Sequence, residues 1–129
     1  MIAVDSSSWI AFFSDTEPSG DDTALVESAL ADHQACLPPV VLTELLSNPK
    51  LPKSLASMFC ELPLLEPHAG YWGRAGRLRA KLIAQGRRAR LTDSLIAQTC
   101  IDHEVRLVTR DDDFLHFSRL GRLRLAISP

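Results

Sequence analysis

The chain has 129 residues, of which 46% are hydrophobic and 23% are charged, and its formal net charge is −2. A chain of this length and composition predicts a single globular domain over residues 1–129 that needs no disulfide or metal to fold. These values exclude disordered, collagen-like and coiled-coil proteins, and no stretch approaches the ~20 apolar residues of a membrane span. The N-terminal MIAVDSSSW lacks the basic region of a signal peptide, so we expect a cytoplasmic protein without a membrane partner.

The apolar pattern predicts short strands that alternate with helices. We expect strands at 2–4, 35–37, 64–65, 106–109 and 123–127. We expect helices at 6–13, 22–32, 38–47, 53–60, 71–85, 92–102 and 111–117, with a loop at 14–22. Gly86 is expected to end the long helix and Thr92 to cap the next one. This alternation predicts an α/β layer fold with a mostly parallel sheet, in which ligands bind beyond the carboxyl ends of the strands.

The charges are divided unevenly along the chain. Residues 1–66 carry 10 acidic and 2 basic residues, whereas residues 67–129 carry 6 acidic and 12 basic residues. The segment 74–90 holds seven basic residues and no acidic one: Arg74, Arg77, Arg79, Lys81, Arg87, Arg88 and Arg90. Such a basic helix suits a polyanionic partner, or it is the solvated face of an ordinary helix.

Four places hold acidic residues where the local pattern does not favour them. Asp5 follows an apolar strand, where it either caps the next helix or faces a ligand. Glu44 lies in the apolar helix PPVVLTELL, where it either coordinates a ligand or occupies the one solvated stripe. Asp93 follows Thr92 in a first helical turn, a position that the helix dipole alone favours. The run 111–113 is three adjacent aspartates, which is either solvated surface or a charge cluster balanced by a cation.

Together, these acidic residues favour a metal site. They belong to separate elements whose ends can meet at one end of a parallel sheet. Oxygen ligands without a neighbouring His or Cys select Mg²⁺ or Mn²⁺. A carboxylate-bound metal beside a basic helix suits hydrolysis of phosphodiester bonds, with the basic face holding the nucleic acid backbone.

The order of these segments resembles the PIN-domain ribonucleases, and among them the VapC toxins of bacterial toxin–antitoxin pairs. The resemblance is carried by IAVDSSSWI, VVLTELLS, YWGRAGRLRAKLIAQG, RARLTDSLIAQTC and LVTRDDDF, which together span positions 2 to 114. It implies a sheet of about five mostly parallel strands flanked by helices in three layers. It also implies metal-dependent RNA cleavage, a homodimer, and inhibition by a cognate antitoxin protein that masks the site.

The resemblance assigns roles to individual residues. It implies Asp5, Glu44, Asp93 and Asp111 as the catalytic acidic set, with Ser7 and Thr109 as supporting hydroxyl groups. We expect the RNA phosphates to be contacted from the basic segment, by Arg74, Arg77, Lys81, Arg87 and Arg88. Positions 74, 77 and 81 share one helix face.

The three adjacent aspartates require a choice. Asp111 is the first acid beyond the strand RLVT, so we expect it to be the chief fourth ligand. If Thr109 caps the following helix, Asp112 falls at the capping-box position and faces solvent. In an extended turn Asp113 points the same way as Asp111 and joins the metal ligands Asp5, Asp93 and Asp111. In a helix that has already begun, it diverges from Asp111.

Other polar residues suggest no second site. Cys36, Cys60 and Cys100 are expected to be reduced core residues, and the four histidines show no ligand spacing, although His116 lies near the aspartate run. Two alternatives remain. A signalling receiver domain would carry an acidic pair after the first strand and a late lysine, and this chain has neither. A non-catalytic PIN-fold binding module would lack acids at the four positions, which are all filled.

Overall fold

The computed structural model describes residues 1–127, which form three strands and seven helices. The strands are β1 (Ile2–Val4), β2 (Ala35–Cys36) and β3 (Arg106–Val108). The helices are α1 (Ser6–Phe13), α2 (Asp21–Ala31), α3 (Pro39–Leu46), α4 (Lys53–Glu61), α5 (Tyr71–Ala84), α6 (Leu91–Asp102) and α7 (Phe114–Leu120). Within these residues, no helix is both long and apolar enough to cross a membrane.

The sheet is parallel, in the order β2-β1-β3. A single parallel bridge lies beyond each edge strand: Leu64 pairs with Leu37 after β2, and Leu125 pairs with Leu107 of β3. The sheet of about five strands that was predicted is therefore present as three strands with one bridge at each edge. The outer segments at 64–65 and 123–127 pair at one residue each, so neither becomes a full strand.

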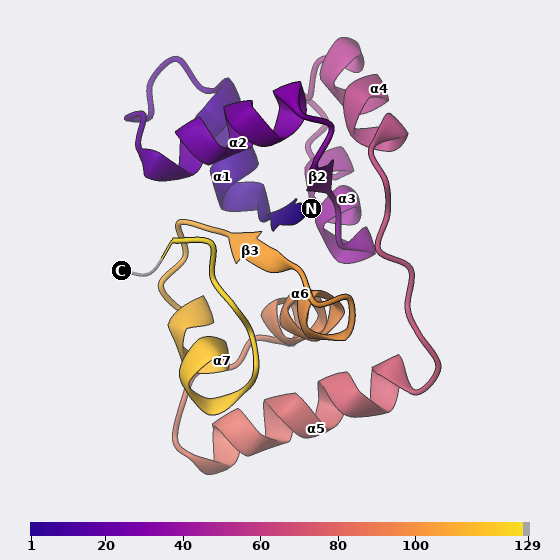
Figure 1. Cartoon of the computed structure of the whole chain (residues 1–129), viewed down its shortest axis with the longest axis vertical. Helices are drawn as coiled ribbons and strands as arrows, with labels where there is room; N and C mark the ends of the chain where they lie inside the picture. The colour runs from indigo at the N-terminus through magenta and orange to yellow at the C-terminus, as the bar shows by residue number, and fades with distance from the viewer. Residues whose placement is uncertain (128–129) are drawn as a thin grey trace.

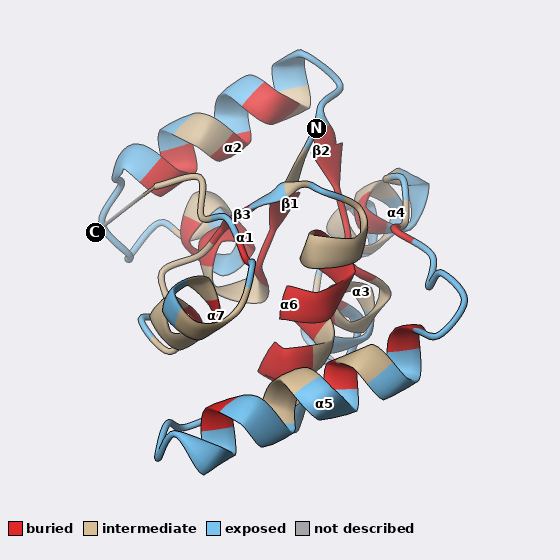
Figure 2. Ribbon diagram, turned by 60° about the horizontal axis from the view of Figure 1, so that its bottom comes forward, coloured by how far each residue is buried: buried red, intermediate tan, exposed pale blue. Residues whose placement is uncertain are grey.

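Helices cover both faces of the sheet (Figure 1). Helices α1 and α2 lie on one side, and α5, α6 and α7 lie on the other. Buried residues concentrate on the strands and on the inner helix α6 (Figure 2), where the segment from Ile96 to Cys100 is buried throughout. Trp9 of α1 is fully buried in this core, as the sequence suggested, and its ring packs edge-on against Phe59 of α4. These layers are the PIN-like α/β arrangement that the sequence predicted.

Most element boundaries agree with the sequence to within one or two residues, with two informative differences at α6 and α7. Gly86 follows α5 with a positive φ of 71°, the conformation expected of a glycine that ends a helix. Thr92, however, lies inside α6, which begins at Leu91 without a side-chain cap. Helix α7 begins at Phe114 and not at position 111, because side-chain hydrogen bonds shape the preceding aspartate run into turns. Cys36 and Cys100 are buried as expected, whereas Cys60 is exposed on α4.

The topology brings distant acidic residues to one end of the sheet. The backbone N–H of Asp5 donates to the carbonyl of Val108 at 2.9 Å, so the end of β1 is joined directly to the end of β3. Residues 5 and 109–113 therefore follow neighbouring strands at the same edge. Helix α6, which packs against β3 and α3, presents its first turn and Asp93 toward this edge.

Candidate active site

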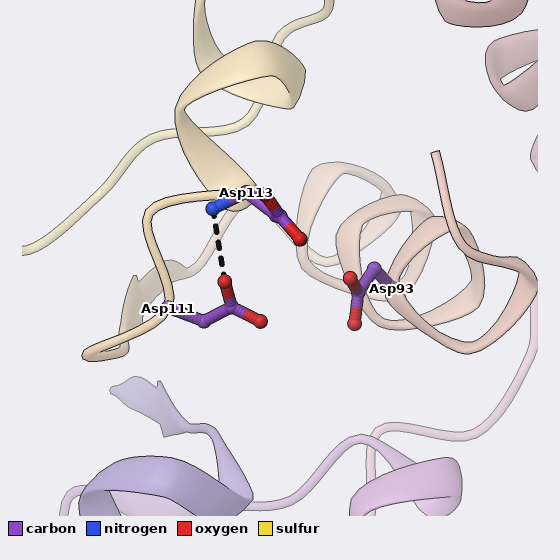
Figure 3. Close-up of side chains that lie close together, drawn as sticks. All are labelled: Asp93, Asp111 and Asp113. Carbon is purple, nitrogen blue, oxygen red and sulfur yellow. Dashed lines mark hydrogen bonds between the residues drawn. The ribbon is translucent and has the colours of Figure 1, made fainter. Parts of the chain in front are cut away.

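Three aspartates converge beyond the carboxyl ends of the strands. One carboxylate oxygen from each of Asp93, Asp111 and Asp113 lies within 4.8 Å of the others. Figure 3 shows the three side chains pointing toward one another, with Asp93 coming from α6 and the other two from the turn before α7. Three carboxylates at this separation repel one another unless a cation or protons balance them.

Asp93 is the member of this group with an unsatisfied atom. Its residue is 8% exposed, and its buried Oδ2 has no hydrogen-bond partner within residues 1–127. Burial raises the pKa of Asp93 to about 6, and the negative charges of Asp111, Asp5 and Asp113 add to this effect. A buried carboxylate that has an unpaired oxygen and lies beside two other carboxylates fits a divalent cation, because Mg²⁺ and Mn²⁺ prefer oxygen ligands of this kind.

Asp5 lies beside the group and is held by hydroxyl groups. Its Oδ2 accepts hydrogen bonds from the Ser7 and Thr109 hydroxyls, each at 2.9 Å. The residue is 6% exposed, and this burial raises its pKa although both hydrogen bonds act in the opposite direction. The structure thus places Ser7 and Thr109, the two predicted supporting residues, directly on the carboxylate of Asp5.

Glu44, on α3, is linked to the site region through Ser6 of α1. Its Oε1 accepts a hydrogen bond of 2.9 Å from the Ser6 hydroxyl of α1. Partial burial raises the pKa of Glu44, and the charge of Asp5 contributes in the same direction. The residue is nevertheless exposed, because α3 buries Val41 and Leu45 and leaves Glu44 outside that buried stripe. Glu44 therefore lies on the solvated stripe of α3, and the apolar sequence around it does not shield it from water.

The aspartate run forms two side-chain-supported turns. The N–H of Asp111 donates to the Thr109 hydroxyl at 3.0 Å, and the N–H of Asp113 donates to Asp111 Oδ1 at 2.9 Å. Thr109 therefore binds this turn and Asp5 instead of capping α7, and no capping box forms with Asp112. The chain forms a hydrogen-bonded turn here, with Asp113 in the αR conformation and not extended. Asp111 and Asp113 nevertheless face the site together, while Asp112 is exposed to solvent.

An ion-pair network that sequence reasoning missed lies behind the site. Asp22 of α2 is 7% exposed; its carboxylate accepts hydrogen bonds from Arg110 Nε at 2.6 Å and Nη2 at 3.0 Å, and from the Ser8 hydroxyl at 2.9 Å. Arg110 Nη2 also donates to the Pro18 carbonyl at 2.6 Å. The only signal in the sequence was a lone arginine beside three aspartates, and nothing linked it to an acid 88 positions earlier.

Arg110 connects this network to the carboxylates. Its backbone N–H donates to the Ser7 hydroxyl at 3.1 Å, and Ser7 in turn donates to Asp5. The side chain turns away from the neighbouring Asp111 toward Asp22. The network therefore joins the segment 17–22 to the end of β3. It also holds the guanidinium group of Arg110 against Asp22, outside the acidic cluster.

The basic residues predicted to contact RNA fall into two groups. Arg88, in the connection between α5 and α6, has its Nε 3.9 Å from Asp113 Oδ2, so this connection borders the acidic cluster. Arg74, in contrast, forms a two-point ion pair with Asp102 at the far end of α6, at 3.1 and 2.7 Å. Asp102 is nine positions from Asp93, or ~14 Å along the helix axis.

The family follows from a sequence comparison. A sequence model of the PIN domain matches residues 2–120. The chain belongs to the PIN-domain family. A comparison with curated proteins finds no match.

Solved structures share the fold of this PIN domain over nearly its whole length. VapBC2 from Rickettsia felis, bound to a DNA fragment from its promoter, is 24% identical with a TM-score of 0.72, and 100% of each chain is covered. VapBC-5 from Mycobacterium tuberculosis is 20% identical with a TM-score of 0.64, covering 96% of this chain and 95% of that one. FitAcB from Neisseria gonorrhoeae is 16% identical with a TM-score of 0.69, covering 97% and 96%. At these identities the likeness establishes the fold.

The raised pKa of Asp93 predicts how the metal-free PIN domain depends on pH. Because this pKa lies above the ordinary 3.8, ionisation of Asp93 lowers the free energy of unfolding as the pH rises through about 6. Asp93→Asn removes that cost, and its amide can donate to the neighbouring carboxylates. In EDTA at about pH 7.5 we expect a gain of at most ~3 kcal/mol in urea unfolding, with a smaller gain near pH 5.

Asp112→Asn is the matched control for that measurement, because Asp112 is exposed and lies outside the cluster. Its free energy of unfolding should change by less than ~0.5 kcal/mol at either pH. A destabilised Asp93→Asn at neutral pH would show that the ionised carboxylate is satisfied in the folded chain, contrary to this account.

The network around Arg110 predicts a second stability effect. Asp22→Ala removes three hydrogen bonds from a buried carboxylate and leaves a guanidinium group without its partner. We expect the free energy of unfolding to fall by ~2 kcal/mol or more. Glu17→Ala is the control, since Glu17 contacts the same Arg110 at 3.7 Å but has a side chain 45% exposed, and should cost less than ~0.5 kcal/mol. Equal losses in thermal or urea unfolding would contradict a structural role for the buried pair.

Proposed function

We propose that this PIN domain is a metal-dependent endoribonuclease and the toxin of a toxin–antitoxin pair. The observation that carries the proposal is the convergence of the Asp93, Asp111 and Asp113 carboxylates, one of which, Asp93, also has a buried oxygen without a hydrogen-bond partner in the described residues. Family membership supports a nuclease, and the basic segment beside these acids favours RNA phosphates as the substrate.

The cofactor that fits is Mg²⁺ or Mn²⁺, held by Asp93, Asp111 and Asp113 with Asp5 beside them. When bound, such an ion lowers the pKa of a water molecule and neutralises charge that develops on the phosphate. Ser7 and Thr109 orient the Asp5 carboxylate through its Oδ2. Glu44, exposed and linked to α1 through Ser6, is the acid of the set with the best access to solvent for proton transfer.

The RNA substrate approaches this site past the basic connection between α5 and α6. Arg88 lies 3.9 Å from Asp113, so Arg87 and Arg88 are placed to hold phosphates next to the scissile bond. Arg88 also offsets part of the negative charge of the cluster. Arg77 and Lys81 lie further along α5 and contact a more distant part of the RNA, whereas Arg74 is held by Asp102 and positions this part of α5.

The partners follow from the structural neighbours. VapBC-5 is described as a member of the VapBC family of toxin–antitoxin systems, and VapBC2 carries the same family name. We therefore propose a cognate antitoxin protein that masks the acidic site, a homodimer as the toxin's own state, and action in the cytoplasm. The receiver-domain alternative does not agree with membership of the PIN-domain family. A binding module without catalysis would not need the converging carboxylates.

The proposed chemistry predicts a graded loss of activity along the aspartate run. EDTA should abolish cleavage of RNA and Mg²⁺ or Mn²⁺ should restore it. Asp111→Asn and Asp5→Asn should lower the rate at saturating metal by at least ~100-fold, Asp113→Asn by less, and Asp112→Asn by no more than ~2-fold. The measurement is single-turnover cleavage of a labelled RNA.

Asp112→Asn is again the internal control, since it removes one negative charge at the position between the proposed ligands Asp111 and Asp113. If Asp5→Asn or Asp111→Asn cleaved RNA at the wild-type rate in a nuclease-free preparation, the site would be misassigned. Cleavage that persists in EDTA would exclude the metal-dependent mechanism.

The proposed antitoxin gives a separate prediction. A short reading frame should abut or overlap the gene of this chain, and its product should form a complex with the purified protein. Expression of the chain alone should arrest growth, and co-expression of that product should relieve the arrest. The Asp93→Asn variant, which lacks one metal ligand, should not arrest growth but should still bind the partner. If the neighbouring product neither binds nor relieves the arrest, the toxin–antitoxin assignment fails while the nuclease assignment stands.

A further inference from the structure

A basic groove lies on the molecule away from the acidic cluster. It has a volume of about 780 Å³ and runs between α5, the C-terminal half of α6 and the turn that follows α7. Four of its lining residues are basic and two are acidic: Arg74, Arg77, Lys81 and Arg122, with Asp102 and Glu104. The sequence placed 74, 77 and 81 on one helix face, and the groove shows that this face is opposed by a second wall.

That second wall depends on a close approach at Gly121. A Cβ at this position would lie 2.6 Å from the carbonyl oxygen of Phe117 and 3.0 Å from Leu78 Cδ1. Only glycine therefore lets the chain turn sharply after α7 and press against α5. The turn carries Arg122 into the groove opposite Arg77 and Lys81, although Arg122 lies far from the basic segment in sequence.

The charges in the groove are not equally available. Asp102 holds Arg74 through Nε and Nη2, so Arg74 serves to join α5 to α6. Arg77, Lys81 and Arg122 are exposed and form no ion pair within the described residues 1–127. Glu104, the other acid of the lining, is not in an ion pair within these residues either, so the groove keeps a net excess of two positive charges. Such an excess along one open groove attracts an extended anion with several charges.

The groove also has a defined position relative to the proposed site. Asp102 marks the groove and Asp93 marks the acidic cluster, and the two are separated by ~14 Å along α6. The start of α5 contacts the end of α6 through Arg74 and Asp102. The basic residues therefore continue along α5 from the groove to Arg87 and Arg88, which lie beside the cluster. Stacked nucleotides advance ~3.4 Å each along the axis of the strand, so a stacked strand needs about four or more nucleotides to reach from one to the other.

We propose that this groove binds the phosphate backbone of an RNA segment remote from the scissile bond, through Arg77, Lys81 and Arg122. The inference rests on the proposed ribonuclease function and extends it to the class of substrate. The enzyme acts on RNA that continues beyond the cleavage site, and very short oligonucleotides bind weakly because they cannot occupy both places. Arg74 acts as a positioning residue for the groove wall.

The test is RNA binding by the full chain in EDTA, where no metal-dependent cleavage occurs. A trinucleotide and a 16-nucleotide RNA are titrated over a range of salt concentrations. The variant neutralises the three cations (Arg77→Gln, Lys81→Gln and Arg122→Gln), and Arg106→Gln is the control because Arg106 is exposed on β3 outside the groove. Circular dichroism and thermal unfolding verify that the variants are folded, as expected for exposed side chains.

We expect the wild type to bind the longer RNA at least ~10-fold more tightly. The triple variant should lose most of this advantage, and its slope of log K against log salt should decrease by ~2, which corresponds to three phosphate contacts on a single strand. Arg106→Gln should retain both the advantage and the slope. A triple variant with wild-type affinity and slope for the longer RNA would overturn the proposal. That result combined with lost binding to poly-L-glutamate would assign the groove to an acidic protein segment instead.

The groove and the ribonuclease assignment can fail separately. Groove-dependent binding without any metal-dependent cleavage would leave the groove standing and remove the enzyme. Cleavage of the trinucleotide and the longer RNA with equal KM, in the wild type and the triple variant alike, would retain the enzyme and remove the groove from its substrate recognition.

Discussion

Repulsion among buried carboxylates is the constraint on which this molecule depends. A parallel sheet places the ends of β1 and β3 side by side, and the chain puts an aspartate after each of them. Helix α6 adds Asp93 from its first turn. The result is a group of negative charges that the folded chain holds together at a cost. The pKa values of Asp5 and Asp93 are raised, first by burial and then by the neighbouring carboxylates. Such a group fits a divalent cation, which would remove this cost on binding.

The neighbouring residues hold this geometry without cancelling the charge. Ser7 and Thr109 orient Asp5 with neutral hydroxyl groups. Arg110 follows Thr109 directly and precedes Asp111, so it is the cation best placed in sequence to neutralise the cluster. Asp22 draws its guanidinium group away through two hydrogen bonds. The buried pair thereby stabilises the segment beside the site and keeps an internal cation from competing with a metal.

The positive charge of the molecule is arranged around, and not within, this group. Arg88 reaches its border at 3.9 Å from Asp113, and α5 extends the basic surface toward the far end of α6. Under the proposed function, the separation of negative and positive regions along α6 would allow one strand of RNA to contact cations along its backbone while a single phosphate approaches the acids. The basic second half of the sequence thus supplies the positive surface of α5 next to the acidic cluster.

The sequence by itself determined the element order, the alternation of strand and helix, and the identity of the acidic residues. These follow from local patterns: an apolar run before Asp5, a first turn before Asp93, and LVT before the aspartate run. Only the tertiary structure decided which of the three aspartates face the site, because Thr109 donates to Asp5 at the end of the neighbouring strand and does not cap α7. It likewise paired Arg110 with Asp22, Arg74 with Asp102, and brought Arg122 opposite α5. Each of these contacts joins residues far apart in the chain. Their distances are set by the packing of whole helices against the sheet, which local sequence patterns do not encode.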